Sequence, residues 1–382
     1  MKKIAVFGST GSIGRSSLQV IGHLKSRFSV FALAAKNNFQ LLAEQANQIR
    51  PQIIVTHDEP TKTRLYQLLN KTMRRKFIIL TGEQGLTEIA VHKQVDTLIM
   101  AMSGTMGIIP LLKAIKQQKQ IALSTKELLV GFGAIIMQQA KRYQAQILPI
   151  DSELAGLHQC LDNRHLSEIK RVIITASGGP FYHRKDLHNI TVKDALQHPV
   201  WKMGKKITID SATLANKGLE VIETARLFSL PQEKISVLIH PQSVIHAMIE
   251  LNDNSVLAQL AQPDMRACIQ YALTYPKRLP TLIKPLDLTT YQKLEFYRPD
   301  PHRFPALKLA YQSLQTGGIA PCVYNTANEI AVSKFLAKKI DFNIIPSIIR
   351  KTLEHMPKIK NPKLTDLLKY EKIARAFAQQ IK

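Results

Sequence analysis

A glycine-rich turn at the start of the chain constrains the fold more than any other feature. The apolar segment 3–7 is followed at once by Gly8-Ser9-Thr10-Gly11-Ser12-Ile13-Gly14, and residues 17–24 then have the spacing of a helix. Glycines permit a tight turn that lets backbone N–H groups approach a pyrophosphate, and the N-terminus of a helix adds positive potential. Because the turn lies between a strand and a helix, the sequence predicts a dinucleotide-binding βαβ unit rather than an ordinary glycine-rich turn.

The same alternation of strand and helix continues through the first 150 residues. A second helix is expected at 39–49, and further strands are expected at 28–34, 52–56, 77–80, 97–100, 121–123 and 146–150. Strands that alternate with helices in this way predict βαβ units and a mostly parallel sheet.

The residues after the second expected strand distinguish NAD from NADP. An NAD site usually has an Asp or Glu there to hold the ribose 2′-hydroxyl. This chain has Ala34-Ala35-Lys36-Asn37-Asn38, which contains no carboxylate, and Lys36 can pair with a 2′-phosphate. The segment therefore favours NADPH; the alternative is that Lys36 is simply a solvated lysine.

The second half of the chain has a different pattern. Strands at 235–239, 247–251 and 255–259 are expected to be antiparallel, with Asp253-Asn254 as a hairpin turn. Prolines then cluster, which indicates a linker, and the last segment has helical periodicity. We therefore expect an α/β protein with an N-terminal Rossmann-like NADPH domain at 1–150, a central α+β catalytic domain with a mobile lid at 151–274, a linker at 275–306 and a small C-terminal helical bundle at 307–382.

Two carboxylates follow the last strand of the first half directly. Asp151 and Glu153 flank Ser152, and in an extended segment residues two apart point the same way. Such a pair at the carboxyl end of a strand suits a hard cation such as Mg²⁺ or Mn²⁺. The alternative is that the two residues are a helix N-cap and a first-turn acid, which is the commoner role of an isolated pair.

A third carboxylate lies in a segment with helical spacing. Asn216, Lys217 and Glu220 are three and four residues apart, so on a helix they share one face. That face offers an amide, a cation and a carboxylate. On spacing alone an ordinary Lys–Glu surface pair is the favoured interpretation.

A candidate anion site lies between these carboxylates. Ser177-Gly178-Gly179-Pro180 follows an expected strand, and a serine beside glycine N–H groups can cradle a phosphate. The irregular stretch 198–206, which contains His198 and the single Trp201, is long enough to be a mobile lid. By itself His198 could equally be a surface histidine.

Composition excludes some classes of protein and favours others. The formal net charge of +24 attracts anions, but the basic residues are scattered and there is one Trp, which argues against a dedicated nucleic-acid binder. Cys160, Cys268 and Cys322 lie far apart, which disfavours a disulfide framework or a zinc site and fits a reducing compartment. The chain has no signal-peptide pattern and no apolar run of the ~20 residues that a membrane span needs. We expect a cytoplasmic protein that binds neither nucleic acid nor membrane.

Taken together, these segments resemble the 1-deoxy-D-xylulose 5-phosphate reductoisomerase family. The matching blocks run in order along nearly the whole chain: GSTGSIG at 8–14, STKE at 124–127, DSE at 151–153, SGGPF at 177–181, HPVWKMGKK at 198–206, DSATLANKGLE at 210–220, HPQSVIH at 240–246, QPDMR at 262–266 and NTANEIAV at 325–332. The resemblance implies NADPH- and metal-dependent rearrangement and reduction of 1-deoxy-D-xylulose 5-phosphate to 2-C-methyl-D-erythritol 4-phosphate in non-mevalonate isoprenoid precursor biosynthesis. It also implies a homodimer.

The resemblance assigns roles to individual positions. The NADPH-contacting positions are Thr10, Gly11, Ser12, Ile13, Lys36, Asn37, Thr125, Glu127 and Gly204. The ligands of a Mg²⁺ or Mn²⁺ ion are Asp151, Glu153 and Glu220. The substrate contacts are Lys126, Ser152, Glu153, Ser177, His198, Ser211, Asn216, Lys217 and Glu220, with the serines, Asn216 and Lys217 around the phosphate. The catalytic positions are Lys126, Glu153 and Glu220, of which Lys126 and Glu153 are candidates for proton transfer and oxyanion stabilisation.

The sequence departs from the family pattern on the cofactor side. Ala35 stands where the family commonly has Gly, Thr125 where it commonly has Asn, and Leu128 where it commonly has Ser.

Two rival functions also remain open. The first is a plain NADP-dependent dehydrogenase of the aspartate-semialdehyde type, which would need no metal and would usually have a nucleophilic Cys or a catalytic His. The second is a basic, nucleotide-binding regulatory protein that binds nucleic acid, which would show salt-dependent retention on DNA.

Overall fold

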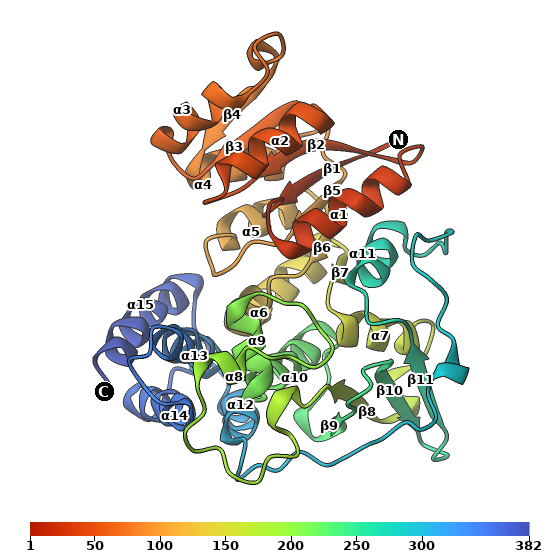
Figure 1. Ribbon diagram of the computed structural model, residues 1–382, viewed down its shortest axis with the longest axis vertical. Helices are drawn as coiled ribbons and strands as arrows, with labels where there is room; N and C mark the ends of the chain where they lie inside the picture. The colour runs from red at the N-terminus through yellow and green to blue at the C-terminus, as the bar shows by residue number, and fades with distance from the viewer. Residues whose placement is uncertain (382) are drawn as a thin grey trace. The chain divides into compact units, whose positions relative to one another are not determined.

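The computed structural model describes residues 1–381, and the chain divides into two compact units (Figure 1). The first unit comprises Met1–Leu128, Ile136–Ala155 and Asp264–Lys284. The second comprises Leu129–Ile135, Gly156–Pro263 and Pro285 onward. Each unit is therefore assembled from segments that are far apart in the sequence.

The first unit is built on a seven-stranded parallel sheet with the strand order β4-β3-β2-β1-β5-β6-β7. Its strands are β1 (Lys2–Phe7), β2 (Phe28–Ala34), β3 (Ile53–Thr56), β4 (Ile78–Thr81), β5 (Thr97–Met100), β6 (Gln120–Leu123) and β7 (Ile147–Pro149). The central strands are short apolar runs buried on both faces, as parallel sheets require. The predicted parallel sheet is confirmed.

Helices connect these strands. They are α1 (Ser12–His23), α2 (Phe39–Ile49), α3 (Glu59–Leu68), α4 (Gly82–Val91), α5 (Ile108–Lys116) and α6 (Lys126–Tyr143). A further helix from much later in the chain, α11 (Met265–Thr274), packs against α1. The strand order reverses at β1, whose neighbours are β2 and β5, and doubly wound sheets bind their ligands at the carboxyl ends of the strands at such a reversal.

The second unit contains a four-stranded sheet with the order β11-β10-β8-β9. Its strands are β8 (Ile169–Ala176), β9 (Ile235–Ile239), β10 (Ile245–Leu251) and β11 (Val256–Leu260). β10 pairs antiparallel with both β8 and β11, and Asn254 forms the expected turn with a φ of 69°. The expectation of an antiparallel β9 is wrong, because β9 pairs parallel with β8 and the helices between them supply the long crossover that a parallel pair needs.

The helices of the second unit are α8 (Val192–Ala195), α9 (Lys205–Ala212), α10 (Ala215–Leu227), α12 (Pro305–Thr316), α13 (Ala320–Leu336), α14 (Ile345–His355) and α15 (Leu364–Gln380), and α7 (Ser152–Leu161) begins in the first unit and continues into the second. Ile174 of β8, Leu219 of α10 and Ile330 of α13 belong to one hydrophobic core. The C-terminal helices thus share a core with the sheet. Within residues 1–381, no helix combines the length and the apolarity that crossing a membrane demands.

Candidate active site

The glycine-rich turn leaves backbone donors available at the N-terminus of α1. Gly11 is the N-cap residue, no side chain caps the helix, and the first turn contains no acidic residue. A Cβ atom on Gly14 would lie 2.2 Å from the carbonyl oxygen of Gly8, so only glycine lets the helix approach the turn this closely. Uncapped N–H groups at a helix N-terminus are a ready site for a phosphate group. Thr10, Ser12 and Ile13 are exposed or partly exposed around this turn.

The candidate ribose-phosphate residues lie at the carboxyl end of β2. Lys36 and Asn37 are exposed, and Asn38 caps α2 by accepting a hydrogen bond from the backbone N–H of Leu41 at 3.0 Å. No carboxylate lies in this segment. Lys36 thus lies exposed just after β2, and its role as a partner of a 2′-phosphate stays a prediction.

Thr125 has a structural role that the sequence did not reveal. It is buried, and its hydroxyl lies 2.7 Å from the carbonyl oxygen of Met102 and 3.2 Å from that of Met100. The hydroxyl thus ties the loop after β5 to the start of α6, and Glu127 lies in the first turn of that helix. Thr125 replaces the family's usual Asn, and its hydroxyl still provides a hydrogen-bonding side chain at this junction.

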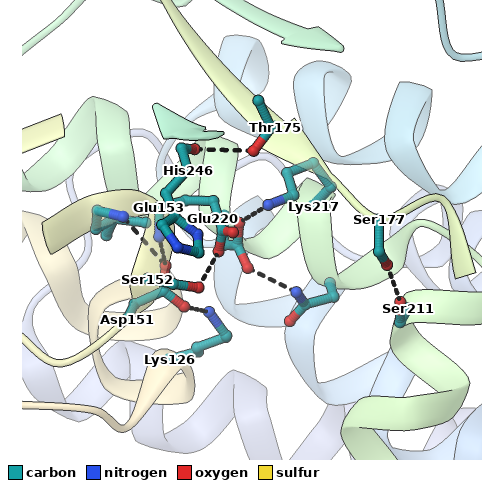
Figure 2. A network of polar contacts seen from close by, with 12 residues as sticks. Lys126, Asp151, Ser152, Glu153, Thr175, Ser177, Ser211, Lys217, Glu220 and His246 are labelled. Carbon is teal, nitrogen blue, oxygen red and sulfur yellow. Dashed lines mark hydrogen bonds and ion pairs between the residues drawn. The ribbon is translucent and has the colours of Figure 1, made fainter. Parts of the chain in front are cut away.

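Asp151 and Glu153 sit at the end of β7 and the start of α7. The Oδ1 atom of Asp151 accepts hydrogen bonds from the backbone N–H groups of Glu153 and Leu154, both at 3.2 Å. The extended geometry predicted for this segment is wrong, and the N-cap alternative describes the backbone, because α7 begins at Ser152. The other oxygen of Asp151, Oδ2, pairs with the Lys126 ammonium group, and the Ser152 hydroxyl donates to Glu153 Oε2 at 2.9 Å (Figure 2).

Asn216, Lys217 and Glu220 share one face of α10, as their spacing predicts. The Asn216 amide donates to Glu220 Oε1 at 2.6 Å, and the Lys217 ammonium group pairs with Glu220 Oε2 (Figure 2). The side chain of Glu220 is 1% exposed and that of Lys217 is 4% exposed. The surface pair that spacing alone favoured is therefore wrong. A buried carboxylate and ammonium group remain charged only where they are paired this closely.

The glycine at 218 lies on the opposite side of α10 from Asn216 and Glu220, since residues two apart on a helix do not share a face. A Cβ atom there would lie 2.7 Å from the Cβ of Ala310 and 2.8 Å from the Tyr324 hydroxyl. Glycine thus allows this side of α10 to pack closely against α12 and α13. The spacing of Asn216, Lys217 and Glu220 did not reveal this packing.

Ser177, His198 and Ser211 form a second polar group within the same unit. His198 Nε2 lies 2.8 Å from the Ser177 hydroxyl, and the Ser177 and Ser211 hydroxyl oxygens lie 3.5 Å apart. His198 Nδ1 accepts from the backbone N–H groups of Val200 (3.2 Å) and Trp201 (2.8 Å). Because Nδ1 accepts, the neutral ring carries its proton on Nε2 and donates it to Ser177.

This arrangement fixes the direction of the Ser177 hydroxyl. Its oxygen accepts from His198 and from the backbone N–H of Gly179 at 3.2 Å, so its own proton is available to Ser211 or to an anion. Burial lowers the pKa of His198 to about 4, which keeps the ring neutral near pH 7. His198 is half-buried and is therefore not the surface histidine of the alternative interpretation.

The expected lid has no regular structure before α9. Residues 198–204 contain no helix or strand, and Gly204 is the N-cap of α9. The indole ring of Trp201 lies 6.3 Å from the His246 ring, measured between centroids. His246 is the last residue of the family motif HPQSVIH at 240–246, to which the sequence analysis assigned no role.

The three thiols are unsuited to nucleophilic catalysis. Burial raises the pKa of Cys160 to about 11 and that of Cys322 to about 12. Burial and the negative charges of Asp151 and Glu153 also raise the pKa of Cys268. A protonated thiol is a poor nucleophile, so the dehydrogenase rival that needs a catalytic cysteine finds none here.

A parallel sheet with a glycine-rich turn between its first strand and first helix is typical of nucleotide-dependent oxidoreductases. Three family models match the chain: "1-deoxy-D-xylulose 5-phosphate reductoisomerase" over residues 4–133, the C-terminal domain of that name over 147–228, and "DXP reductoisomerase C-terminal domain" over 260–377. The chain belongs to the 1-deoxy-D-xylulose 5-phosphate reductoisomerase family, and the resemblance drawn from its motifs is confirmed.

Relatives and solved structures of this name match nearly the full chain. The reductoisomerase of Caldanaerobacter subterraneus subsp. tengcongensis is 47% identical over 371 residues, which cover 96% of each chain. That of Protochlamydia amoebophila is 43% identical and covers 100% of this chain and 99% of its own.

The solved enzyme of Zymomonas mobilis in complex with NADPH is 39% identical, with a TM-score of 0.91 and coverage of 99% of this chain and 98% of its own. A solved DOX-P reductoisomerase in complex with NADPH, fosmidomycin and magnesium is also 39% identical, with a TM-score of 0.92 and coverage of 99% and 97%. These likenesses confirm the predicted α/β fold.

Proposed function

We propose that this chain converts 1-deoxy-D-xylulose 5-phosphate to 2-C-methyl-D-erythritol 4-phosphate, with NADPH and a divalent metal ion as cofactors, in isoprenoid precursor biosynthesis. The observation that carries the proposal is the full-length match to relatives of that name, combined with the buried Lys217–Glu220 pair where the family pattern has a metal ligand and a phosphate contact. NADPH supplies a hydride when it is bound, and a bound divalent ion polarises a carbonyl group.

The residues of the first unit fit NADPH. The uncapped N-terminus of α1 offers N–H groups to a pyrophosphate through Thr10, Gly11, Ser12 and Ile13. Lys36 and Asn37 then bind the 2′-phosphate that distinguishes NADPH from NADH. Thr125, Glu127 and Gly204 are assigned to the cofactor only by their positions in the family pattern.

Asp151, Glu153 and Glu220 are the proposed metal ligands. All three are carboxylates, the oxygen donors that Mg²⁺ and Mn²⁺ prefer. Three carboxylates in one place repel one another. The Lys126 ammonium group beside Asp151 and the Lys217 ammonium group beside Glu220 offset much of that repulsion before an ion binds.

The proposed phosphate site consists of Ser177, Ser211, Asn216 and Lys217. The directed hydroxyl of Ser177 donates to a phosphate oxygen, and Lys217 supplies the positive charge. His198 remains neutral and orients Ser177. Because the phosphate does not react, its binding energy is available to close the 198–204 segment over the substrate and to exclude water.

Lys126 and Glu153 are the proposed groups for oxyanion stabilisation and proton transfer. Lys126, beside Asp151, is placed to stabilise an oxyanion, and Glu153, whose Oε2 accepts from Ser152, is placed to take or return a proton at a substrate hydroxyl. Ser152 completes the substrate contacts of this half of the site. The carbon skeleton rearranges by a retro-aldol and aldol sequence, which needs these proton transfers.

We also propose a homodimer in the cytoplasm. β11 is an edge strand of its sheet, and Val256 and Leu257 on it are 50% and 37% exposed, an apolar edge that is suited to pairing with a second copy. The free thiols suit a reducing compartment. Sedimentation should give a dimer mass for the wild type and a smaller mass for Val256→Lys; a monomeric wild type would contradict the dimer.

The function is tested by following NADPH absorbance after 1-deoxy-D-xylulose 5-phosphate is added with Mg²⁺ or Mn²⁺. Oxidation that stops when a chelator is added supports substrate, cofactor and metal together. Oxidation that continues in chelator would make the carboxylates structural and would favour a plain dehydrogenase. An absence of oxidation by the folded protein would mean that family membership does not extend to this activity.

A further inference from the structure

The short helix α9 (Lys205–Ala212) connects two parts of the proposed site. Its N-cap is Gly204, at the end of the irregular 198–204 segment, and its last turn carries Ser211, whose hydroxyl lies 3.5 Å from that of Ser177. The hydroxyl and the backbone N–H of Thr208 both donate to the Gly204 carbonyl oxygen, at 2.9 and 3.1 Å. The direction in which α9 points therefore sets both the end of the lid and the position of Ser211.

A buried carboxylate holds this helix. Asp210 is 1% exposed and does not belong to the proposed metal ligands. Its Oδ1 atom accepts from the side-chain amide of Asn328 on α13 at 2.8 Å, and its Oδ2 atom forms an ion pair with the Lys206 ammonium group at 2.8 Å. Lys206 lies one helical turn earlier, beside the lid, so a single carboxylate links the lid end of α9 to a core helix.

The partner on α13 is as deeply buried as Asp210. Asn328 is 0% exposed, and α13 packs within the core shared by the sheet and the C-terminal helices. A charge in such a place is costly unless it is paired, and an apolar residue would fill the space without that cost. A helix of two turns is too short to fix its own direction, so a directional anchor contributes what apolar packing alone does not.

We propose that Asp210 and Asn328 are positioning residues that anchor α9 to α13, so that Ser211 faces Ser177 and the 198–204 segment is held where it can cover the substrate. The proposal rests on the proposed function, because it takes Ser177 and Ser211 as phosphate contacts. It gives the C-terminal helices a part in substrate binding although they contribute no residue to the site.

The test compares two buried asparagines on the same helix. Asn328→Ala removes the amide that binds Asp210. Asn325→Ala removes an amide of equal size, three residues earlier, whose Oδ1 atom has no hydrogen-bond partner within residues 1–381. We expect Asn328→Ala to raise the KM for 1-deoxy-D-xylulose 5-phosphate about tenfold while kcat changes by less than about twofold, since binding is lost without loss of reacting groups. Asn325→Ala should leave both constants near those of the wild type.

A charge exchange separates positioning from general damage to the core. Asn328→Asp places two carboxylates together and should raise the KM by more than Asn328→Ala does. Adding Asp210→Asn to it restores one carboxylate and one amide across the same gap, and should return the KM to within about threefold of the wild type. This rescue also keeps the proposal testable if one of the single variants does not fold.

A second readout does not depend on turnover. Trp201 is the single tryptophan, so acrylamide quenching of its fluorescence reports the exposure of the lid. Quenching should increase in Asn328→Ala and Asn328→Asp and should be unchanged in Asn325→Ala. If the wild type shows no turnover, the proposed function fails, while the quenching comparison still decides the anchor. Unchanged quenching and KM in folded Asn328→Ala, or equal changes in Asn325→Ala, would overturn the proposal.

Discussion

The two proposed anion sites, the turn at the start of the first unit and the polar face of α10 in the second unit, differ in their physical means. The turn uses backbone N–H groups that are exposed and uncapped, and glycines make them accessible. The α10 face uses an ammonium group and a carboxylate that are almost entirely buried and depend on each other. A backbone site is encoded locally by a few glycines, whereas a buried side-chain site depends on helices that arrive from distant parts of the chain.

The largest effect is expected at Glu220, because two roles meet there. Glu220→Gln should lower kcat by at least about a thousandfold, since the proposed metal ligand loses its charge and Lys217 is left buried without its counter-ion. NADPH binding, followed by fluorescence titration, should change little because it belongs to the other unit. Normal turnover by Glu220→Gln, or a loss of NADPH binding instead of turnover, would contradict the proposed role of Glu220.

The next largest effect is expected at Gly14, in the turn whose backbone N–H groups are proposed to bind NADPH. Gly14→Ala places a Cβ atom 2.2 Å from the Gly8 carbonyl oxygen, so the turn must open, and the KM for NADPH should rise about a hundredfold. The matched control is Gly22→Ala in the same helix, where a Cβ atom meets nothing within 4 Å and alanine should stabilise the fold by about 0.5–1 kcal/mol. Equal NADPH constants for both variants would mean that the close approach is irrelevant to binding.

A smaller effect is expected at Lys36. It is exposed, so the loss of its charge in Lys36→Ala should weaken NADPH by about tenfold or less and should leave NADH unaffected. The ratio of kcat/KM for the two cofactors measures this directly. An equal loss for both cofactors would remove Lys36 from the 2′-phosphate site.

The smallest effect concerns pH and His198. Burial lowers the pKa of His198 in the folded protein to about 4, below its ordinary 6.5. The unfolded chain therefore takes up a proton between pH 6.5 and 4 that the folded protein does not, and stability falls as the pH drops through this window. His198→Asn should make the denaturant-derived free energy of unfolding less steep in pH by up to about one proton. An unchanged slope would place His198 in solvent.

Sequence reasoning succeeded where the signal was local. The turn at 8–14, the strands around it and the hairpin at 253–254 depend on neighbouring residues, and their positions were predicted within a few residues. Helix α1 begins at Ser12, five residues before the predicted start, because the glycine-rich run already contains its first turn.

It failed where the outcome depends on distant partners. The pairing direction of β9 is set by the crossover helices that separate it from β8. Lys217 and Glu220 are almost entirely buried, and their spacing along α10 carries no trace of this burial. The family motifs identified these positions, but only the structure shows that the two side chains are buried and paired.

In the proposed reaction one chain joins a rearrangement of the carbon skeleton to a reduction. The most direct measurement is the proton NMR spectrum of the product formed from 1-deoxy-D-xylulose 5-phosphate, NADPH and Mg²⁺. Rearrangement places the methyl group on a carbon that bears no hydrogen, so a methyl singlet is predicted. A methyl doublet would show direct reduction of the unrearranged ketone and would contradict the account.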